Sequence, residues 1–140
     1  MDNLTPARSC LLLKGRRVLL VEDDAILSMC LEDQLLEVGA EIVGYASGVG
    51  EALRILERAA GRDGIDVAIV DINLDGHSGL PVADALARRG VPFLFSTGYP
   101  AGFDTGRHGA VPVLHKPYPM RQLIHTIEAL CHAAECRLPG

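Results

Sequence analysis

Short apolar runs alternate with helix-length segments along most of this chain, and this alternation limits its possible folds more than any other feature. Runs of strand length occur at residues 18–21, 67–70 and 91–96, and shorter ones at 41–45 and 111–114. Because the runs are apolar at consecutive positions, both faces of each strand need to be covered. The sequence therefore predicts an α/β fold, a doubly wound parallel sheet with helices on both faces.

The segments between the runs have the spacing of amphipathic helices. Ser78 can cap one of them, because Pro81 then falls in the first turn and Gly90 follows the last. A fourth helix is due between Gly98 and Gly109, but glycine dominates there, and we expect it to be short or irregular. The other helices are predicted over residues 24–38, 49–60, 78–89 and 119–134.

Size and charge restrict the class of protein. A chain of 140 residues fits one domain, and a net charge of −5 argues against nucleic-acid binding. Its apolar runs are too short to span a membrane, so we expect a cytoplasmic protein. We predict an N-terminal extension over residues 1–15, loosely attached, a single domain over 16–137 and no output domain. The four cysteines lack the spacing of a disulfide framework or a complete metal site, and we expect them to be reduced packing residues.

Polar side chains stand at the ends of the predicted strands. In an open parallel sheet these ends meet at one edge, where ligands bind. Clustered carboxylates there would suit Mg²⁺, and a carboxylate beside the ion can attack a phosphoryl group. A hydroxyl and an ammonium could hold the transferred oxygens. The residues at these ends are Glu22, Asp23 and Asp24, then Asp71, then Ser96 and Thr97, and finally His115 and Lys116.

Four stretches in this order resemble the receiver domain of two-component response regulators. They are V-L-L-V-E-D-D (18–24), V-D-I-N-L-D-G-H-S-G (70–79), F-S-T-G-Y (95–99) and H-K-P-Y (115–118). The resemblance implies a five-stranded sheet of order 2-1-3-4-5. It also implies a phosphoacceptor at Asp71, a switch hydroxyl at Thr97, a catalytic lysine at Lys116 and a Mg²⁺ (or Mn²⁺) ion. The implied metal ligands are Glu22, Asp23, Asp71 and the backbone carbonyl of Asn73.

The stretch F-S-T-G-Y further resembles the FAT GUY subgroup of single-domain response regulators, with Ser96 in place of the usual alanine. We expect Thr97, Gly98 and Tyr99 to form a switch. Two positions depart from the general receiver pattern. Val113 stands where an aromatic residue is usual, which favours Tyr99 as its replacement, and Asp75 stands where proline is usual, which would leave an extra carboxylate near the metal.

The resemblance implies a function in signalling rather than an enzyme acting on an external substrate. The chain would accept a phosphoryl group from a sensor histidine kinase or a histidine phosphotransfer protein. It would then signal by contact with a downstream protein or through a phosphorelay, without nucleic acid or membrane. The alternative that stays open is a pseudo-receiver, which binds partners without being regulated by phosphorylation.

Other readings of the same residues are weaker. Residues 71–76 match the start of an EF-hand loop, but its twelfth position is Val82 rather than glutamate. A phosphatase with a nucleophilic Asp71 would need an acid two residues later, where Asn73 stands. Acidic residues at 22–24 would also suit a solvated helix start, and Asp24 fits an N-cap better than a ligand.

Overall fold

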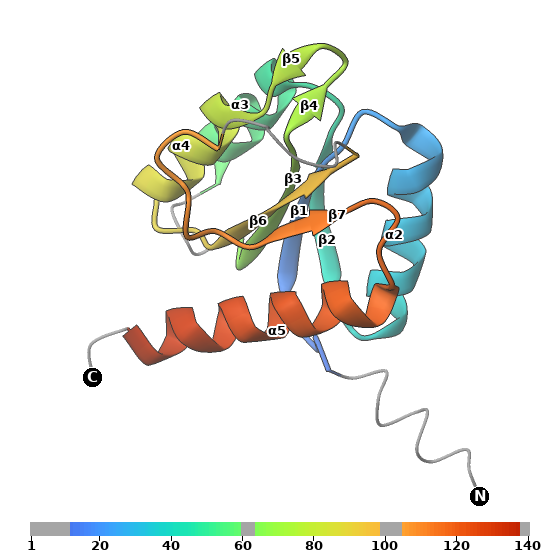
Figure 1. The fold of residues 1–140 in the computed structure, drawn as a ribbon. Coiled ribbons are helices and arrows are strands. Elements are labelled where there is room, and N and C mark those ends of the chain that lie inside the picture. Colours follow the sequence, from blue (N-terminus) through green and yellow to red (C-terminus); the bar gives the residue numbers. More distant parts are fainter. Residues whose placement is uncertain (1–11, 60–63, 99–104, 138–140) are drawn as a thin grey trace, which may run out of the picture.

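The computed structural model describes residues 12–59, 64–98 and 105–137. Its centre is a parallel sheet of five strands in the order β2-β1-β3-β6-β7 (Figure 1). This is the predicted order 2-1-3-4-5, and the α/β fold class is confirmed. The strands are β1 (Arg17–Val21), β2 (Glu41–Ala46), β3 (Val67–Asp71), β6 (Phe93–Thr97) and β7 (Val113–His115).

Two apolar cores lie on opposite faces of the sheet, because alternate strand residues point to opposite sides. One core joins side chains such as Leu19 and Val70 to α3 and α4, and the other joins Leu20 and Ile69 to α2 and α5. Both layers of helices are visible in Figure 1. The helices are α2 (Ala25–Glu37), α3 (Val49–Arg58), α4 (Leu80–Arg88) and α5 (Met120–Arg137).

Helix α2 begins as the sequence predicts. Asp24 is its N-cap, and the carboxylate accepts hydrogen bonds from the backbone N–H groups of Ile26 at 3.0 Å and Leu27 at 3.1 Å. Helix α4 begins differently. Its N-cap is Gly79, and Ser78 lies one residue earlier, where its hydroxyl still accepts a bond from the N–H of Leu80. None of the helices in the described ranges has the length and apolarity needed to cross a bilayer.

Where a fourth helix was due, residues 105–110 form turns, and residues 99–104 lie outside the described part of the chain. The prediction of a short or irregular segment is therefore confirmed for residues 105–110. The absence of a helix in this portion fits its composition, since Gly106 adopts a positive φ of 60°.

A small hairpin between β3 and α4 was not predicted. Strands β4 (Asn73–Leu74) and β5 (His77–Ser78) pair in antiparallel fashion through a turn at Asp75 and Gly76. Both turn residues have positive φ, 53° and 85°, the conformation that Asp-Gly favours in a two-residue hairpin. The signal was present in the sequence, but flanking strands of two residues are too short to show a strand pattern.

The predicted loose attachment of residues 1–15 is wrong for the described residues 12–15. Leu13 is fully buried in the core formed with α2 and α5. Its N–H donates to the carbonyl of Val38 at 2.9 Å, and the N–H of Gly15 donates to Gly39 at 3.0 Å. This segment therefore packs as part of the domain, ahead of the first strand.

Candidate functional site

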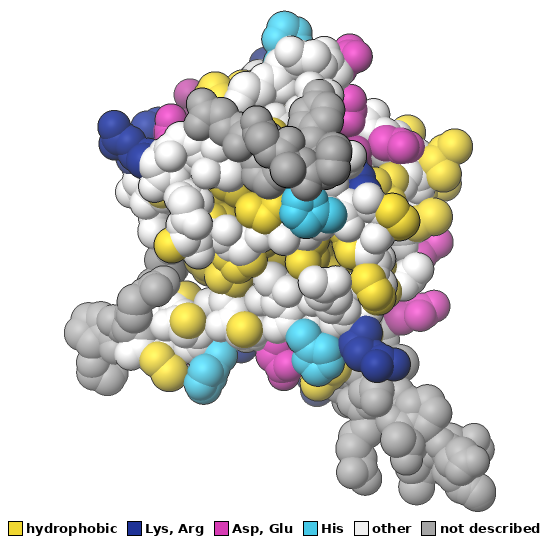
Figure 2. Space-filling view, in the orientation of Figure 1, with side chains coloured by type: hydrophobic (Ala, Val, Ile, Leu, Met, Phe, Trp, Pro, Cys, Tyr) yellow, Lys and Arg dark blue, Asp and Glu magenta, His cyan; other side chains and the backbone are white. Residues whose placement is uncertain are grey.

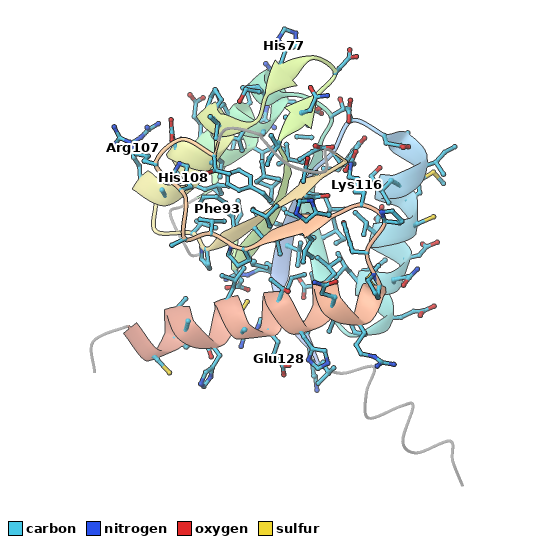
Figure 3. The ribbon with its side chains drawn as sticks, viewed as in Figure 1. His77, Phe93, Arg107, His108, Lys116 and Glu128 are labelled. Carbon is cyan, nitrogen blue, oxygen red and sulfur yellow. The ribbon has the colours of Figure 1, made fainter. Side chains whose placement is uncertain are left out.

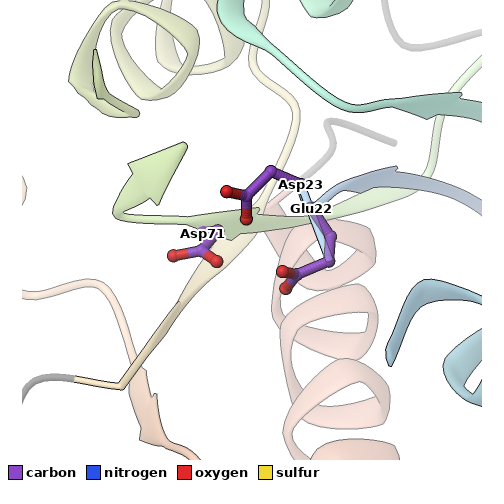
Figure 4. Close-up of side chains that lie close together, drawn as sticks. All are labelled: Glu22, Asp23 and Asp71. Atoms are coloured by element: carbon purple, nitrogen blue, oxygen red, sulfur yellow. The ribbon is translucent and has the colours of Figure 1, made fainter. Parts of the chain in front are cut away.

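The carboxyl ends of β1 and β3 bring three acidic side chains together. Strand order reverses between these two neighbours, because β2 follows on one side of β1 and β3 lies on the other. Carboxylate oxygens of Glu22, Asp23 and Asp71 all lie within 4.8 Å of one another (Figure 4). Glu22 and Asp71 are buried, with 2% and 4% of their surface exposed, and Asp23 is exposed.

Lys116, at the end of β7, reaches into this acidic cluster. Its ammonium donates to Asp71 Oδ2 at 2.8 Å and to Glu22 at 3.0 Å (Oε1) and 3.3 Å (Oε2). Burial acts to lower the pKa of Lys116, but hydrogen bonds to Asp71 and Glu22 outweigh it and raise that pKa. The lysine therefore stays charged and holds two buried carboxylates.

The crowded environment of the cluster changes the pKa of Glu22. Burial raises its pKa from the ordinary 4.5 to about 7, although the hydrogen bond from Lys116 acts in the opposite direction. The negative charge of Asp71 adds to the increase. One ammonium thus does not fully neutralise the cluster, and protons or a further cation are favoured there.

The donor set fits a magnesium ion. Three carboxylates that are close enough to share one ion, with a single ammonium among them, leave a net charge of −2 when all are ionised. Oxygen ligands and a hollow open to water are what Mg²⁺ requires, because it retains part of its hydration shell. The hollow has a volume of about 370 Å³ and is lined by Glu22, Asp23, Asp24, Asp71, Asn73, Gly98 and Lys116.

The backbone around Asp71 holds its carboxylate in place. The N–H of Asn73 donates to Asp71 Oδ1 at 2.9 Å, and Asn73 lines the hollow as the resemblance implied. On the other side, Gly79 packs directly against the Asp71 carbonyl. A Cβ at Gly79 would lie 2.2 Å from that oxygen, so only glycine fits. We did not single out Gly79 from the sequence; its signal is the glycine that ends the 70–79 stretch.

Strand β6 lies between the strands that carry Asp71 and Lys116. Ser96 pairs with Asp71 and Thr97 with His115, while the N–H of Lys116 donates to the Thr97 carbonyl at 2.7 Å. Thr97 is 1% exposed. Of the predicted switch residues, Gly98 lines the hollow, whereas Tyr99 lies outside the described residues.

Other candidates from the sequence lie elsewhere. Asp75 stands in the hairpin turn and does not line the hollow, so the expected extra carboxylate near the metal is wrong. Cys131 is buried and free, whereas Cys30 and Cys136 are free and exposed, and Cys10 is not described. Within the described ranges, the only grouping with three potential metal ligands is Glu22, Asp23 and Asp71.

Two hydroxyls lie under the site, that of Ser96, which the sequence places at a strand end, and that of Tyr118, which was not assigned a role. The Ser96 and Tyr118 hydroxyl oxygens are buried near each other, but neither makes a hydrogen bond of good geometry within the described residues. Burial raises the pKa of Tyr118, while the nearby Ser96 hydroxyl acts to lower it. Tyr118 ends the H-K-P-Y stretch, so its place beside Lys116 could have been anticipated, but its inward direction could not.

Comparison with known families and proteins agrees with this geometry. The family model described as the response regulator receiver domain matches residues 18–128. Transcriptional regulatory protein PdtaR of Mycobacterium tuberculosis is 33% identical over 117 residues, which cover 81% of this chain and 55% of that protein. The chain thus spans about half the length of this relative.

Two further similarities come from another curated protein and a solved structure. Phyllosphere-induced regulator PhyR of Methylorubrum extorquens is 38% identical over 91 residues, covering 64% of this chain and 33% of that protein. The solution structure of SdrG from Sphingomonas melonis Fr1 is 38% identical, with a TM-score of 0.71, covering 83% of this chain and 96% of SdrG.

Proposed function

The chain belongs to the response regulator receiver domain family, and we propose that it accepts a phosphoryl group on Asp71 and signals through the change that follows. Receiver domains are phosphoacceptor signalling modules and have histidine kinases as their general partners. The observation that carries the proposal is the convergence of Asp71 with Glu22, Asp23 and Lys116 at one edge of the sheet.

In the proposed reaction, a carboxylate oxygen of Asp71 attacks phosphorus in a phosphohistidine of the partner. A bond from oxygen to phosphorus forms, the phosphorus–nitrogen bond breaks, and the imidazole leaves with its electron pair. Lys116 already contacts Asp71 at 2.8 Å and is positioned to follow the charge onto the phosphoryl oxygens. Hydrolysis or transfer to another protein would later remove the group.

Glu22, Asp23, Asp71 and the carbonyl of Asn73 would hold Mg²⁺ or Mn²⁺. The ion would supply charge neutralisation for the phosphoryl oxygens. Asp23 is the exposed member of the cluster and therefore meets an arriving ion in water. With Glu22 engaged there, the Lys116 ammonium, which also contacts Asp71, would be available for the phosphoryl group.

Thr97 and Gly98 are proposed to report the state of Asp71. A hydrogen bond from the Thr97 hydroxyl to a phosphoryl oxygen would draw the end of β6 toward Asp71, and Gly98 leaves the backbone free to follow. The motif F-S-T-G-Y supports assignment to the FAT GUY subgroup, in which Tyr99 would take part in the switch. Hydrogen exchange across residues 97–110, with and without beryllofluoride, tests this in wild type and Thr97→Ala.

A surface for the phosphodonor lies beside the site. Ile26 and Met29 on α2 are apolar but 75% and 64% exposed, and α2 starts at the acidic cluster. Apolar side chains gather over the flank formed by α2 in Figure 2. Such a surface suits a helical protein that presents a histidine, and we propose that a kinase or phosphotransfer protein docks here. A downstream protein would use the phosphorylated form, with residues 16–137 acting as a single domain in the cytoplasm.

Intact-mass measurement after incubation with acetyl phosphate and Mg²⁺ tests the proposed function. Wild type should gain one phosphoryl group, and Asp71→Asn should not. Asp23→Ala should weaken Mg²⁺ binding, whereas Asp33→Ala, which removes an exposed acid from α2, should not. A gain that persists in Asp71→Asn would place the acceptor elsewhere, and no gain in wild type would favour a pseudo-receiver.

A further inference from the structure

The described part of the connection between β6 and β7 is organised around His108. The N–H of His108 donates to the carbonyl of Thr105 at 3.0 Å, and the N–H of Val111 donates to the carbonyl of His108 at 3.1 Å. These bonds close two successive turns that share His108. The short segment 105–111 therefore behaves as one compact unit with a histidine at its centre.

The His108 side chain points inward. It is 8% exposed, and its ring centroid lies 5.4 Å from that of Phe93 and 6.3 Å from that of Phe95, in edge-to-face arrangements (Figure 3). The two phenylalanines contact each other in the same manner at 5.5 Å. The imidazole thus completes an aromatic cluster on β6, toward the strand end that lies away from Lys116.

Helix α4 holds the same segment from another side. Nε2 of His108 lies 2.7 Å from Oδ1 of Asp84, at hydrogen-bond distance. Gly106 packs on Leu80, since a Cβ at Gly106 would lie 3.5 Å from Leu80 Cδ1. Leu80 and Asp84 are one helical turn apart and share a face of α4. The segment is therefore fixed both to the first residues of β6 and to one face of α4.

The contacts that His108 makes with Asp84 and the phenylalanines can break and form again at low cost in free energy. The Asp84 side chain is 46% exposed, so its bond to His108 competes with water and its carboxylate stays solvated if the bond opens. An imidazole leaving the aromatic cluster is also well solvated, unlike a phenyl ring. A contact built from these groups can be released without leaving a buried charge behind.

We propose that His108 is a latch that holds the segment 105–111 in its resting position against Asp84, Phe93 and Phe95. The proposal rests on the proposed phosphorylation of Asp71. Strand β6 ends at Thr97 beside the site, and the same strand carries Phe93 and Phe95, which pack against His108. A pull on Thr97 toward a phosphoryl group would therefore work against the latch. By linkage, weakening the latch should strengthen the binding of a phosphoryl mimic.

Two variants and a matched control test the latch. Asp84→Ala removes the partner of His108 without touching the site, and His108→Ala also removes the ring. Asp33→Ala is the control, because it removes an exposed carboxylate from α2. Loss of one hydrogen bond should raise beryllofluoride affinity about 3- to 10-fold. The double variant should bind the mimic no more tightly than His108→Ala, because both changes act through the same contact.

Hydrogen exchange without the mimic tests the latch separately from phosphorylation. The amides of His108 and Val111 should exchange faster in Asp84→Ala than in wild type and Asp33→Ala. Unchanged exchange there, or equal mimic affinity in wild type and Asp84→Ala, would overturn the latch while the phosphoryl site stands. If wild type neither gains a phosphoryl group from acetyl phosphate nor binds beryllofluoride, the proposed function fails and the latch fails with it.

Discussion

The two ends of strand β6 are made of different kinds of side chain. At the carboxyl end, Ser96 and Thr97 lie between the strands that carry Asp71 and Lys116. At the other end, Phe93 and Phe95 pack against each other and against His108. One end carries buried hydroxyls and lies between charged side chains of its neighbours, and the other is aromatic.

The residues that surround the reactive site therefore lie at one end of β6, and those that pack against the following segment lie at the other. Buried carboxylates cost desolvation free energy, and they persist because Lys116 and hydrogen bonds offset part of that cost. The aromatic end carries a smaller cost of this kind, because Phe93 and Phe95 are apolar and the buried imidazole of His108 lies at hydrogen-bond distance from Asp84. Changes at the polar end should therefore alter reactivity and pH dependence, whereas changes at the aromatic end should alter the position of the following segment.

Removing Lys116 should have the largest effect. Lys116→Ala leaves Glu22 and Asp71 without their shared ammonium, and it removes the group that would follow the phosphoryl charge. We expect phosphorylation by acetyl phosphate to slow by about 100-fold or more, and the metal-free protein to lose about 2 kcal/mol of stability at pH 8. Intact-mass time courses and urea unfolding measure these effects, with Lys14→Ala as the exposed control. Equal rates in the two variants would exclude a role for Lys116.

Gly79→Ala should come next, because it forces a contact at the site. The added Cβ would lie 2.2 Å from the Asp71 carbonyl oxygen, so the start of α4 or the end of β3 must move. We expect a loss of about 2 kcal/mol in the free energy of unfolding and a slower gain of phosphoryl mass. Gly109→Ala is the control, since its Cβ would meet nothing within 4 Å. Similar stabilities for both variants would show that the backbone at residue 79 adapts freely.

Much of this architecture could be predicted from the sequence. The apolar strands and the periodic helices require a covered parallel sheet, and that requirement already places Glu22, Asp71 and Lys116 at one edge. The predicted boundaries of the helices were less accurate. Ser78 carries the composition of an N-cap, but pairing with Asn73 draws it into a strand and moves the helix start to Gly79.

The contacts that depend on tertiary placement could not be predicted. His108 has no ligand spacing in the sequence, and only the fold brings it between Asp84 and Phe93. Leu13 sits in a short apolar run that has no strand partner in the pattern, yet it fills a gap beside α2 and α5. Local periodicity reports which face of an element is buried and does not report which distant side chain meets it.

The titration of Glu22 should be visible as pH-dependent stability. Its pKa is 4.5 in the unfolded chain and about 7 in the folded protein, so the folded state binds more protons between these values. Stability is therefore highest below about pH 4.5 for this group and falls as pH rises through 7. We expect a loss of about 1–2 kcal/mol from this group between pH 5 and pH 8 in the absence of Mg²⁺.

Urea unfolding across this pH range measures the effect. Glu22→Gln should remove this component, because the amide does not titrate. Saturating Mg²⁺ should also reduce it, because the ion favours the ionised carboxylate as pH rises. A wild-type profile identical to that of Glu22→Gln without metal would mean that Glu22 remains ionised throughout the range, held by Lys116.

Tyr118→Phe should have the smallest effect and the opposite sign. The Tyr118 hydroxyl is buried and makes no hydrogen bond of good geometry within the described residues, so it contributes a desolvation cost without a compensating bond. Replacing it by hydrogen should leave the free energy of unfolding unchanged or raise it by up to about 1 kcal/mol. Burial raises the pKa of this tyrosine, so the variant should also lose a step at high pH in the alkaline absorbance titration. Tyr45→Phe, on the exposed face of β2, is the control. A clear loss of stability in Tyr118→Phe alone would show that the hydroxyl is hydrogen-bonded in solution and that this bond compensates for its burial.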